Sequence, residues 1–328
     1  MRNVRNFRNI IVTTGDLDGI GLEIAVKSLR KIRVPANQRI LLFCGPNHRD
    51  FSAHLLAGAD PDIYNDLGEA LNSRPRRSYP LTLISNRTPP PLWVEEACRH
   101  CLRNRKDVLV TGPLSKPLIV KTGLKDLGHT DILSRLSGKR DLFMSFWGPE
   151  LNVVLLTGHL PLAQVEQNLT ARRIRQATSL AAQFVRDWMP HLQKKPGAIL
   201  GVNPHAGDLG LIGNKEKLLK NVYRQLARAA WKVEGPLPGD SAFLLENRLK
   251  YSVFFASYHD QGLIPFKLLH GFNEGVHVTL GLPFLRASVD HGPAKEIFGL
   301  NKANCGSMIN ALKLAIESGG GGAATGSK

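Results

Sequence analysis

Cysteines and long apolar runs are scarce in this sequence, and both shortages exclude whole classes of protein. Four cysteines among 328 residues are too few and too scattered for the disulfide framework of a secreted protein, so we expect reduced thiols. Apolar runs such as residues 39–44 and 153–156 are far shorter than the ~20 residues that a transmembrane helix needs. The basic N-terminus lacks the long apolar region of a secretion signal. We therefore expect a cytoplasmic protein with no membrane partner.

Two of the cysteines, Cys98 and Cys101, form a C-x-x-C pair without the second pair that would complete a zinc site. They fall within a helical pattern over residues 93–103, where a three-residue step places both side chains on one face. We expect this pair to pack in a hydrophobic core.

Acidic residues are outnumbered, and the formal net charge is +16. The basic residues are spread along the chain and are not interleaved with aromatic residues as in single-strand binders, so we expect no nucleic-acid partner. Nucleic-acid binding stays an alternative that the charge alone favours. A small anionic substrate accounts for the charge equally well.

Strand-like hydrophobic runs alternate with helical patterns along the chain, which is typical of a mostly parallel α/β fold. We expect strands at 10–14, 39–44, 81–84, 107–111, 141–146, 152–157, 198–202, 251–257 and 276–280, and helices at 22–32, 93–103, 171–188 and 215–230.

No Pro/Gly-rich linker separates two independent halves, so we expect the chain to cross more than once between two α/β/α domains with a cleft between them. Residues 1–128 together with about 287–318 are expected to form the first domain, and residues 129–286 the second. The Gly-rich ending, 319–328, has the composition of a flexible tail.

Three histidines each follow a strand-like run: His159, His205 and His259. Ligands of parallel α/β sheets bind at the carboxyl ends of the strands, so these imidazoles could meet and hold a divalent metal with open coordination positions. A hydrogen-bonded loop or core position is the alternative for each of them. Asp260, next to His259, is placed to orient a ligand or to accept a proton.

Several strand-to-helix turns carry residues suited to an anionic ligand. The first turn, Gly15 to Gly21, is not G-x-G-x-x-G, so the sequence does not support a Rossmann dinucleotide site there. Lys116 could face an anion from the start of a helix. His129 and Thr130 open another helix, where both side chains could donate hydrogen bonds to a phosphate and Thr130 could cap the helix.

A further polar set lies in the last third of the chain: Lys267, Arg286, Asp290 and His291. The guanidinium of Arg286 follows a short apolar segment, and a fixed guanidinium binds a phosphate or a carboxylate through two parallel hydrogen bonds.

These motifs, in their order and spacing, closely resemble the 4-hydroxythreonine-4-phosphate dehydrogenase family of pyridoxal phosphate biosynthesis, over about residues 10–318. The matching segments are Gly128-His-Thr130, Thr157-Gly-His-Leu-Pro-Leu162, Asn203-Pro-His-Ala-Gly207, Gly235-Pro-Leu-Pro238 with Asp240, Tyr258-His-Asp-Gln-Gly262, and Thr279-Leu-Gly-Leu-Pro283 with Ser288-Val-Asp-His-Gly292.

The resemblance implies a homodimer of two-domain α/β subunits, related in fold to the isocitrate and isopropylmalate dehydrogenases and not to Rossmann enzymes. It implies that His159, His205 and His259 bind the metal across the dimer interface, with one of them supplied by the second subunit. Zinc is the expected metal, with magnesium or cobalt as alternatives. The residues implied to hold the phosphorylated substrate are His129, Thr130, Lys267 and Arg286.

The implied reaction is the NAD-linked, or NADP-linked, oxidation and decarboxylation of 4-phosphooxy-L-threonine to 3-amino-1-hydroxyacetone phosphate. We assign Asp260 and Lys267 to catalysis, while no local motif marks the nicotinamide contacts. His277 stands where the family usually has an Asn that contacts the substrate, and Leu17, Leu22 and Pro293 are further departures. A related dehydrogenase of another phosphorylated hydroxy acid, such as a four-carbon sugar-acid phosphate, is therefore the alternative, and a metal-dependent hydrolase is a more distant one.

Overall fold

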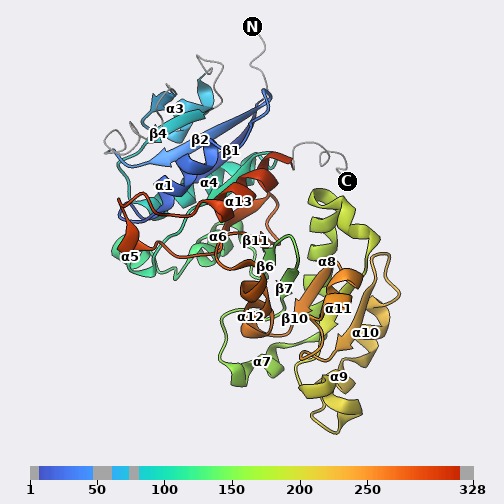
Figure 1. Ribbon diagram of the computed structural model, residues 1–328. Helices are drawn as coiled ribbons and strands as arrows, with labels where there is room; N and C mark the ends of the chain where they lie inside the picture. Colours follow the sequence, from blue (N-terminus) through green and yellow to red (C-terminus); the bar gives the residue numbers. More distant parts are fainter. Residues whose placement is uncertain (1–6, 47–60, 74–80, 318–328) are drawn as a thin grey trace. The chain divides into compact units, whose positions relative to one another are not determined.

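The computed structural model describes residues 7–46, 61–73 and 81–317, which divide into two α/β units (Figure 1). One unit comprises Met1–Leu142 and Leu282–Lys328, and the other Phe143–Gly281. The chain thus leaves the first unit and returns to it. The expected flexible tail, 319–328, lies outside the described residues.

Residues 129–142 and 282–286 belong to the first unit, whereas the sequence analysis placed them in the second domain. The physical reason is the apolar face of helix α6 (His129–Ser137), which is buried within the first unit. Ile132 packs with Val94 and Ile119, and Leu133 joins the main core of that unit.

The sheet of the first unit has the strand order β3-β4-β2-β1-β5-β12, and all its neighbouring strands are parallel. These strands are β1 (Arg8–Thr13), β2 (Gln38–Cys44), β3 (Asp62–Tyr64), β4 (Leu81–Ser85), β5 (Val108–Thr111) and β12 (Arg286–Val289). Every residue of β2 and β5 is buried, as parallel strands covered on both faces require. The sequence analysis did not predict β3 or β12, which are short and carry polar residues.

Helix α4 of the first unit begins with prolines in its first turn and presents Trp93, Cys98 and Cys101 to the core, as the sequence predicts for the two cysteines. The Trp93 ring stacks on Phe43 with centroids 5.8 Å apart. The helices of this unit are α1 (Gly21–Leu29), α3 (Leu67–Asn72), α4 (Pro90–Arg103), α5 (Lys116–Lys121), α6, the 3-10 turn η3 (Lys295–Ile297) and α13 (Gly306–Glu317).

The sheet of the second unit has the strand order β11-β6-β7-β10-β8-β9. Strands β7, β10, β8 and β9 are parallel neighbours, and β6 is antiparallel to both β7 and β11. The strands are β6 (Phe143–Trp147), β7 (Asn152–Leu155), β8 (Gly197–Leu200), β9 (Val233–Leu237), β10 (Val253–Ala256) and β11 (Val276–Leu280). The mixed α/β fold that the sequence predicts is confirmed.

Of the two helices predicted for the second unit, the one over 171–188 is confirmed as α8, and the one expected over 215–230 is two short helices, α9 and α10. Helices α7, α11 and α12 were not predicted. Leu219 separates the two helices with φ −92° and ψ 1°, and its side chain is buried. The helical elements are α7 (Leu162–Asn168), α8 (Ala171–Trp188), η1 (Pro190–Lys194), η2 (Pro204–Gly210), α9 (Lys215–Leu218), α10 (Lys220–Leu226), α11 (Leu245–Lys250) and α12 (His259–His270).

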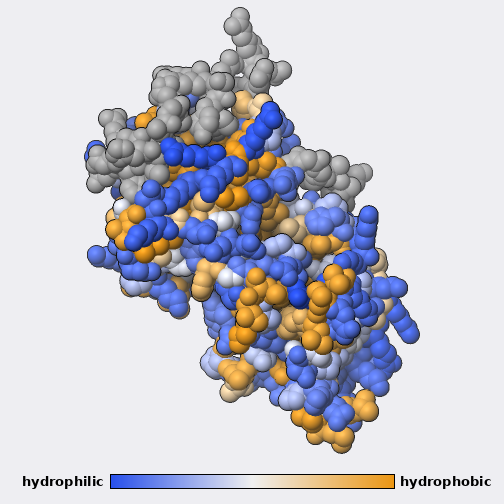
Figure 2. Space-filling model, viewed as in Figure 1, coloured by the Kyte–Doolittle hydropathy of each residue, from blue (hydrophilic) through white to orange (hydrophobic). Residues whose placement is uncertain are grey.

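The surface of the second unit carries exposed apolar side chains on α12 and just beyond it. Ile264, Leu268 and Phe272 recur at four-residue spacing and are 67%, 84% and 65% exposed. Figure 2 shows apolar surface in the region of α12 and α11. Among the described residues, no helix combines the length and apolarity that crossing a membrane would require.

Candidate functional site

Three neighbouring parallel strands of the second unit, β7, β10 and β8, end just before the three histidines. Polar side chains tie these strand ends together. The Thr157 hydroxyl donates to the Ser257 carbonyl at 2.6 Å, and the Ser257 hydroxyl donates to the Leu200 carbonyl at 3.0 Å. Gln261 accepts from the Ser257 N–H at 2.6 Å and donates to the Gly201 carbonyl at 2.7 Å. The expectation that these strand ends share one edge of the sheet is therefore met.

Two of the histidines lie side by side at that edge. The rings of His159 and His259 have centroids 5.3 Å apart, and both line a cavity of about 290 Å³ together with Gly158, Tyr258 and Asp260. The Nδ1 atom of His259 lies 2.7 Å from Oδ1 of Asp260. This contact orients the imidazole so that Nε2 is left for a ligand, which is how a carboxylate commonly positions a metal-binding histidine.

His205 lies on a different kind of segment, the turn η2. Its backbone is left-handed, with φ 52°, and its side chain is exposed. Within residues 7–46, 61–73 and 81–317, no three His, Cys, Asp or Glu side chains gather into one metal-binding group. The donor chemistry of His159 and His259, two adjacent imidazoles lining a cavity, fits two of the ligands of a divalent cation.

In the first unit, Arg286 is fully buried at the start of β12 and donates through Nη2 to the Thr111 hydroxyl at 2.6 Å. Thr111 ends β5, the strand next to β12, so the guanidinium lies across two strands. His129 begins α6, and its Nε2 is buried without a hydrogen-bond partner among the described residues. A buried polar atom in this state fits a site that receives a polar ligand.

Burial governs the charges of both groups. It lowers the pKa of Arg286 to about 9, which still leaves the guanidinium cationic at neutral pH. Burial, and secondarily the nearby Arg286, lowers the pKa of His129 well below the ordinary histidine value. The pair therefore offers an anion one positive charge and one neutral imidazole.

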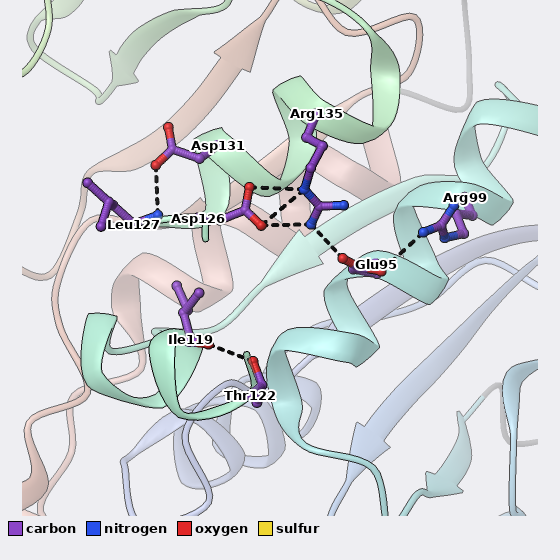
Figure 3. Close-up of polar contacts among 8 residues, drawn as sticks. All are labelled: Glu95, Arg99, Ile119, Thr122, Asp126, Leu127, Asp131 and Arg135. Carbon is purple, nitrogen blue, oxygen red and sulfur yellow. Dashed lines mark hydrogen bonds and ion pairs between the residues drawn. The ribbon is translucent and has the colours of Figure 1, made fainter. Parts of the chain in front are cut away.

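Helix α6 is held in place by the network of charged side chains in Figure 3. Arg135 donates to both oxygens of Asp126, at 3.1 and 2.7 Å for Oδ2 and 3.2 Å for Oδ1, and to Glu95 of α4 at 2.5 Å. Asp131 accepts from the Leu127 N–H at 2.9 Å. The network thus fastens the segment 126–128, which leads directly into His129.

Thr130 does not cap α6, contrary to one reading of the sequence. The helix begins at His129, with Gly128 as its N-cap residue and no side-chain cap. Thr130 is therefore already inside the first turn and half-buried.

The loops after β1, β5 and β12, which the sequence analysis treated separately, meet at one edge of the first unit. Asp16 is buried, accepts from the Ser115 N–H at 2.9 Å and lies 3.0 Å from the Lys295 ammonium. The Ile20 N–H donates to the Pro293 carbonyl at 2.9 Å. Sequence reasoning missed Asp16, Ser115 and Lys295 because their contacts join residues far apart in the chain. Lys116 is exposed.

Lys267 and His277 lie in the second unit. The Lys267 ammonium lies 4.7 Å from the centre of the Phe272 ring. The half-buried His277 ring stacks on Phe146 with centroids 5.0 Å apart, so it packs against the sheet instead of extending into solvent. Of the remaining predicted polar residues, Asp290 accepts from Ser307 at 3.4 Å and His291 contacts the Gly292 carbonyl.

Comparisons with known proteins identify the family of this chain. Residues 92–315 match the family model described as pyridoxal phosphate biosynthetic protein PdxA. The 4-hydroxythreonine-4-phosphate dehydrogenase of Sulfurihydrogenibium sp. (strain YO3AOP1) is 33% identical, with 94% of this chain and 97% of that relative covered.

Two solved structures cover most of the chain. That of 4-hydroxythreonine-4-phosphate dehydrogenase from Klebsiella pneumoniae is 28% identical with a TM-score of 0.76, covering 95% of this chain and 98% of the other. That of a terephthalate 1,2-cis-dihydrodiol dehydrogenase from Burkholderia xenovorans LB400 is 26% identical with a TM-score of 0.62, covering 94% and 98%.

Proposed function

The chain belongs to the PdxA family of pyridoxal phosphate biosynthetic proteins and is a 4-hydroxythreonine-4-phosphate dehydrogenase-like oxidoreductase, and we propose that its substrate is 4-phosphooxy-L-threonine. The proposed reaction is oxidation by NAD⁺ followed by decarboxylation to 3-amino-1-hydroxyacetone phosphate. The observation that carries it is the pair of imidazoles, His159 and His259, lining one cavity at adjacent strand ends.

We assign His159 and His259 of one subunit and His205 of a second to a divalent cation. Zinc is preferred over magnesium because the donors are nitrogens, and cobalt is a further alternative. The ring contact between His159 and His259 supports assigning these two to one subunit and His205 to the partner. The cation would act as a Lewis acid toward the substrate's secondary hydroxyl and the ketone made from it. Asp260, in contact with His259 Nδ1, positions that imidazole.

The charge and burial around Arg286 support its role as the phosphate-binding residue. Its guanidinium is fully buried, cationic and held by Thr111, so it is preorganised for a dianion. His129, neutral at pH 7, adds one N–H donor, and Thr130 adds a hydroxyl. Lys267 is assigned to substrate binding and, with Asp260, to catalysis, in which the carboxylate of Asp260 is the group proposed to accept the hydroxyl proton.

The chemical sequence balances with these groups. The C–H hydride of the secondary alcohol passes to NAD⁺, the hydroxyl proton passes to the base, and a ketone forms β to the carboxylate. The C–C bond to the carboxylate then breaks, CO₂ leaves, and the resulting enol is protonated. The same steps apply to NADP⁺.

An exposed apolar row near the pair of imidazoles supports an association of two subunits. The exposed apolar row Ile264, Leu268 and Phe272 continues the helix that begins at His259. Burying such a row against a second copy would be favourable, and it would bring the partner close to the pair of imidazoles. We therefore propose a homodimer with a shared active site.

The alternative is a related dehydrogenase of another hydroxy acid, such as a four-carbon sugar-acid phosphate. His277 favours it, as does the likeness to a dehydrogenase named for a terephthalate dihydrodiol. A panel of phosphorylated hydroxy acids, assayed for NADH formation with zinc, magnesium or cobalt, separates the two substrates. Release of inorganic phosphate without NADH formation would instead point to a hydrolase.

A further inference from the structure

The segment that carries His205 has an unfavourable backbone. Five consecutive residues, 205–209, have φ values of 52°, 52°, 80°, 41° and 56°, and only Gly207 among them lacks a Cβ atom. Left-handed backbone is disfavoured for residues with a Cβ atom and persists only where surrounding groups hold it. Gln261 donates a hydrogen bond to the carbonyl of Gly201, directly after strand β8, but this bond lies four residues before His205.

Glu216, the second residue of α9, makes the contacts that continue from there. Its Oε1 accepts from the Val202 N–H at 2.8 Å and from the Asn203 N–H at 2.9 Å, and its Oε2 accepts from the Asn203 side-chain amide at 3.0 Å. The carboxylate is buried, with 6% of the residue exposed.

The other side of the same carboxylate packs on the left-handed turn. A Cβ atom added to Gly207 would lie 2.6 Å from Oε2 of Glu216. Glu216 therefore contacts the chain on both sides of His205. It accepts hydrogen bonds from Val202 and Asn203 before it and packs closely on Gly207 after it.

We propose that Glu216 is a positioning residue for His205, and that its hydrogen bonds to Val202 and Asn203 hold the imidazole where it binds metal. This inference rests on the proposed role of His205 as a ligand. Glu216 would thus preorganise His205 without binding the metal itself.

The test measures Zn²⁺ affinity of the full-length protein by chelator competition, and the visible spectrum of Co²⁺ added to the metal-free protein. Glu216→Ala should weaken Zn²⁺ binding by ~10- to 100-fold, the usual cost of losing such a partner, and should change the Co²⁺ spectrum. Glu216→Gln should recover most of the affinity, because an amide oxygen can accept both backbone hydrogen bonds and Asn203 can turn its own oxygen to the new amide. Lys220→Ala, an exposed change at the next helix, should behave as the wild type.

Wild-type affinity and spectrum in Glu216→Ala would overturn the proposal, and so would equal losses in the Ala and Gln variants. If Glu216→Ala fails to fold, Glu216→Asp takes its place, because the shorter carboxylate cannot reach all three donors and should also weaken binding. His205→Ala separates this inference from the proposed function. Unchanged Zn²⁺ affinity in His205→Ala would refute the proposed role of His205 as a metal ligand, whereas loss in that variant without loss in Glu216→Ala would refute only the positioning role.

Discussion

The imidazole rings of His159 and His259 follow two neighbouring strands, β7 and β10, and lie with centroids 5.3 Å apart. In the proposed shared site, one chain would therefore supply both of these imidazoles. His205, on its separate left-handed turn, is the histidine that we assign to the opposite subunit.

Mixed dimers test this division. A dimer of one His159→Ala chain and one His205→Ala chain should recover activity and metal, because one of its two shared sites keeps all three histidines. A dimer of His159→Ala and His259→Ala chains should recover neither, since each site loses a ligand. Metal content and turnover of tagged, purified mixed dimers provide the measurement. The opposite pattern would show that His159 and His259 come from different subunits.

The apolar row on α12 should be required for the dimer. Leu268→Glu places a charge in the proposed interface, and we expect it to shift the protein to monomers in sedimentation experiments and to remove activity with little change in folding. Val120→Arg, an exposed apolar position on α5 of the first unit, serves as the matched control and should leave the dimer intact. A dimeric Leu268→Glu protein would exclude this face.

His277 should determine substrate choice. An imidazole differs from an amide in size and in donor geometry, and the stack on Phe146 limits the orientations of its ring. We expect His277→Asn to move the ratio of kcat/KM toward 4-phosphooxy-L-threonine and away from sugar-acid phosphates, by ~10-fold or more. His191→Asn, at an exposed position, is the control. The same substrate selectivity in His277→Asn and in the control would show that His277 does not contact the substrate.

The half-buried His129, whose Nε2 atom is buried, should make folding sensitive to acid. Its pKa is lowered in the folded state by burial and by Arg286, so below ~6.5 the unfolded chain binds a proton that the folded chain does not. Stability should therefore fall as pH decreases below ~6.5, by up to ~1.4 kcal/mol per pH unit from this group, until the folded-state pKa is reached. The free energy of unfolding, measured with denaturant at several pH values, should change less steeply with pH for His129→Gln than for the wild type or for His191→Gln.

The ion pair that fastens α6 should influence phosphate binding more than catalysis. Arg135→Ala removes hydrogen bonds to Asp126 and Glu95, and because the Arg135 side chain is 43% exposed we expect a loss of only ~1 kcal/mol in the free energy of unfolding. The looser segment before His129 should raise KM for the phosphorylated substrate while kcat changes less. Arg135→Lys should restore part of the loss, and Arg99→Ala, at the exposed end of the network, should have little effect. A fall in kcat at unchanged KM would contradict this role.

Local patterns in the sequence determined most of the fold and marked the candidate site residues. Apolar runs such as 40–44 and 108–110 predict buried parallel strands, because each residue of such a strand meets a covered face of the sheet. The histidines after β7, β8 and β10 were predictable for the same reason, since strand ends of a parallel sheet share one edge.

Tertiary contacts decided what the local patterns leave open. The pairing of His159 with His259, the placement of α6 in the first unit and the cluster of Asp16, Ser115 and Lys295 depend on residues far apart in the chain. The left-handed turn at His205 has no local signal either, because its own residues disfavour that backbone. The buried carboxylate of Glu216, which accepts hydrogen bonds from Val202 and Asn203 just before this turn, reaches it only in the folded chain.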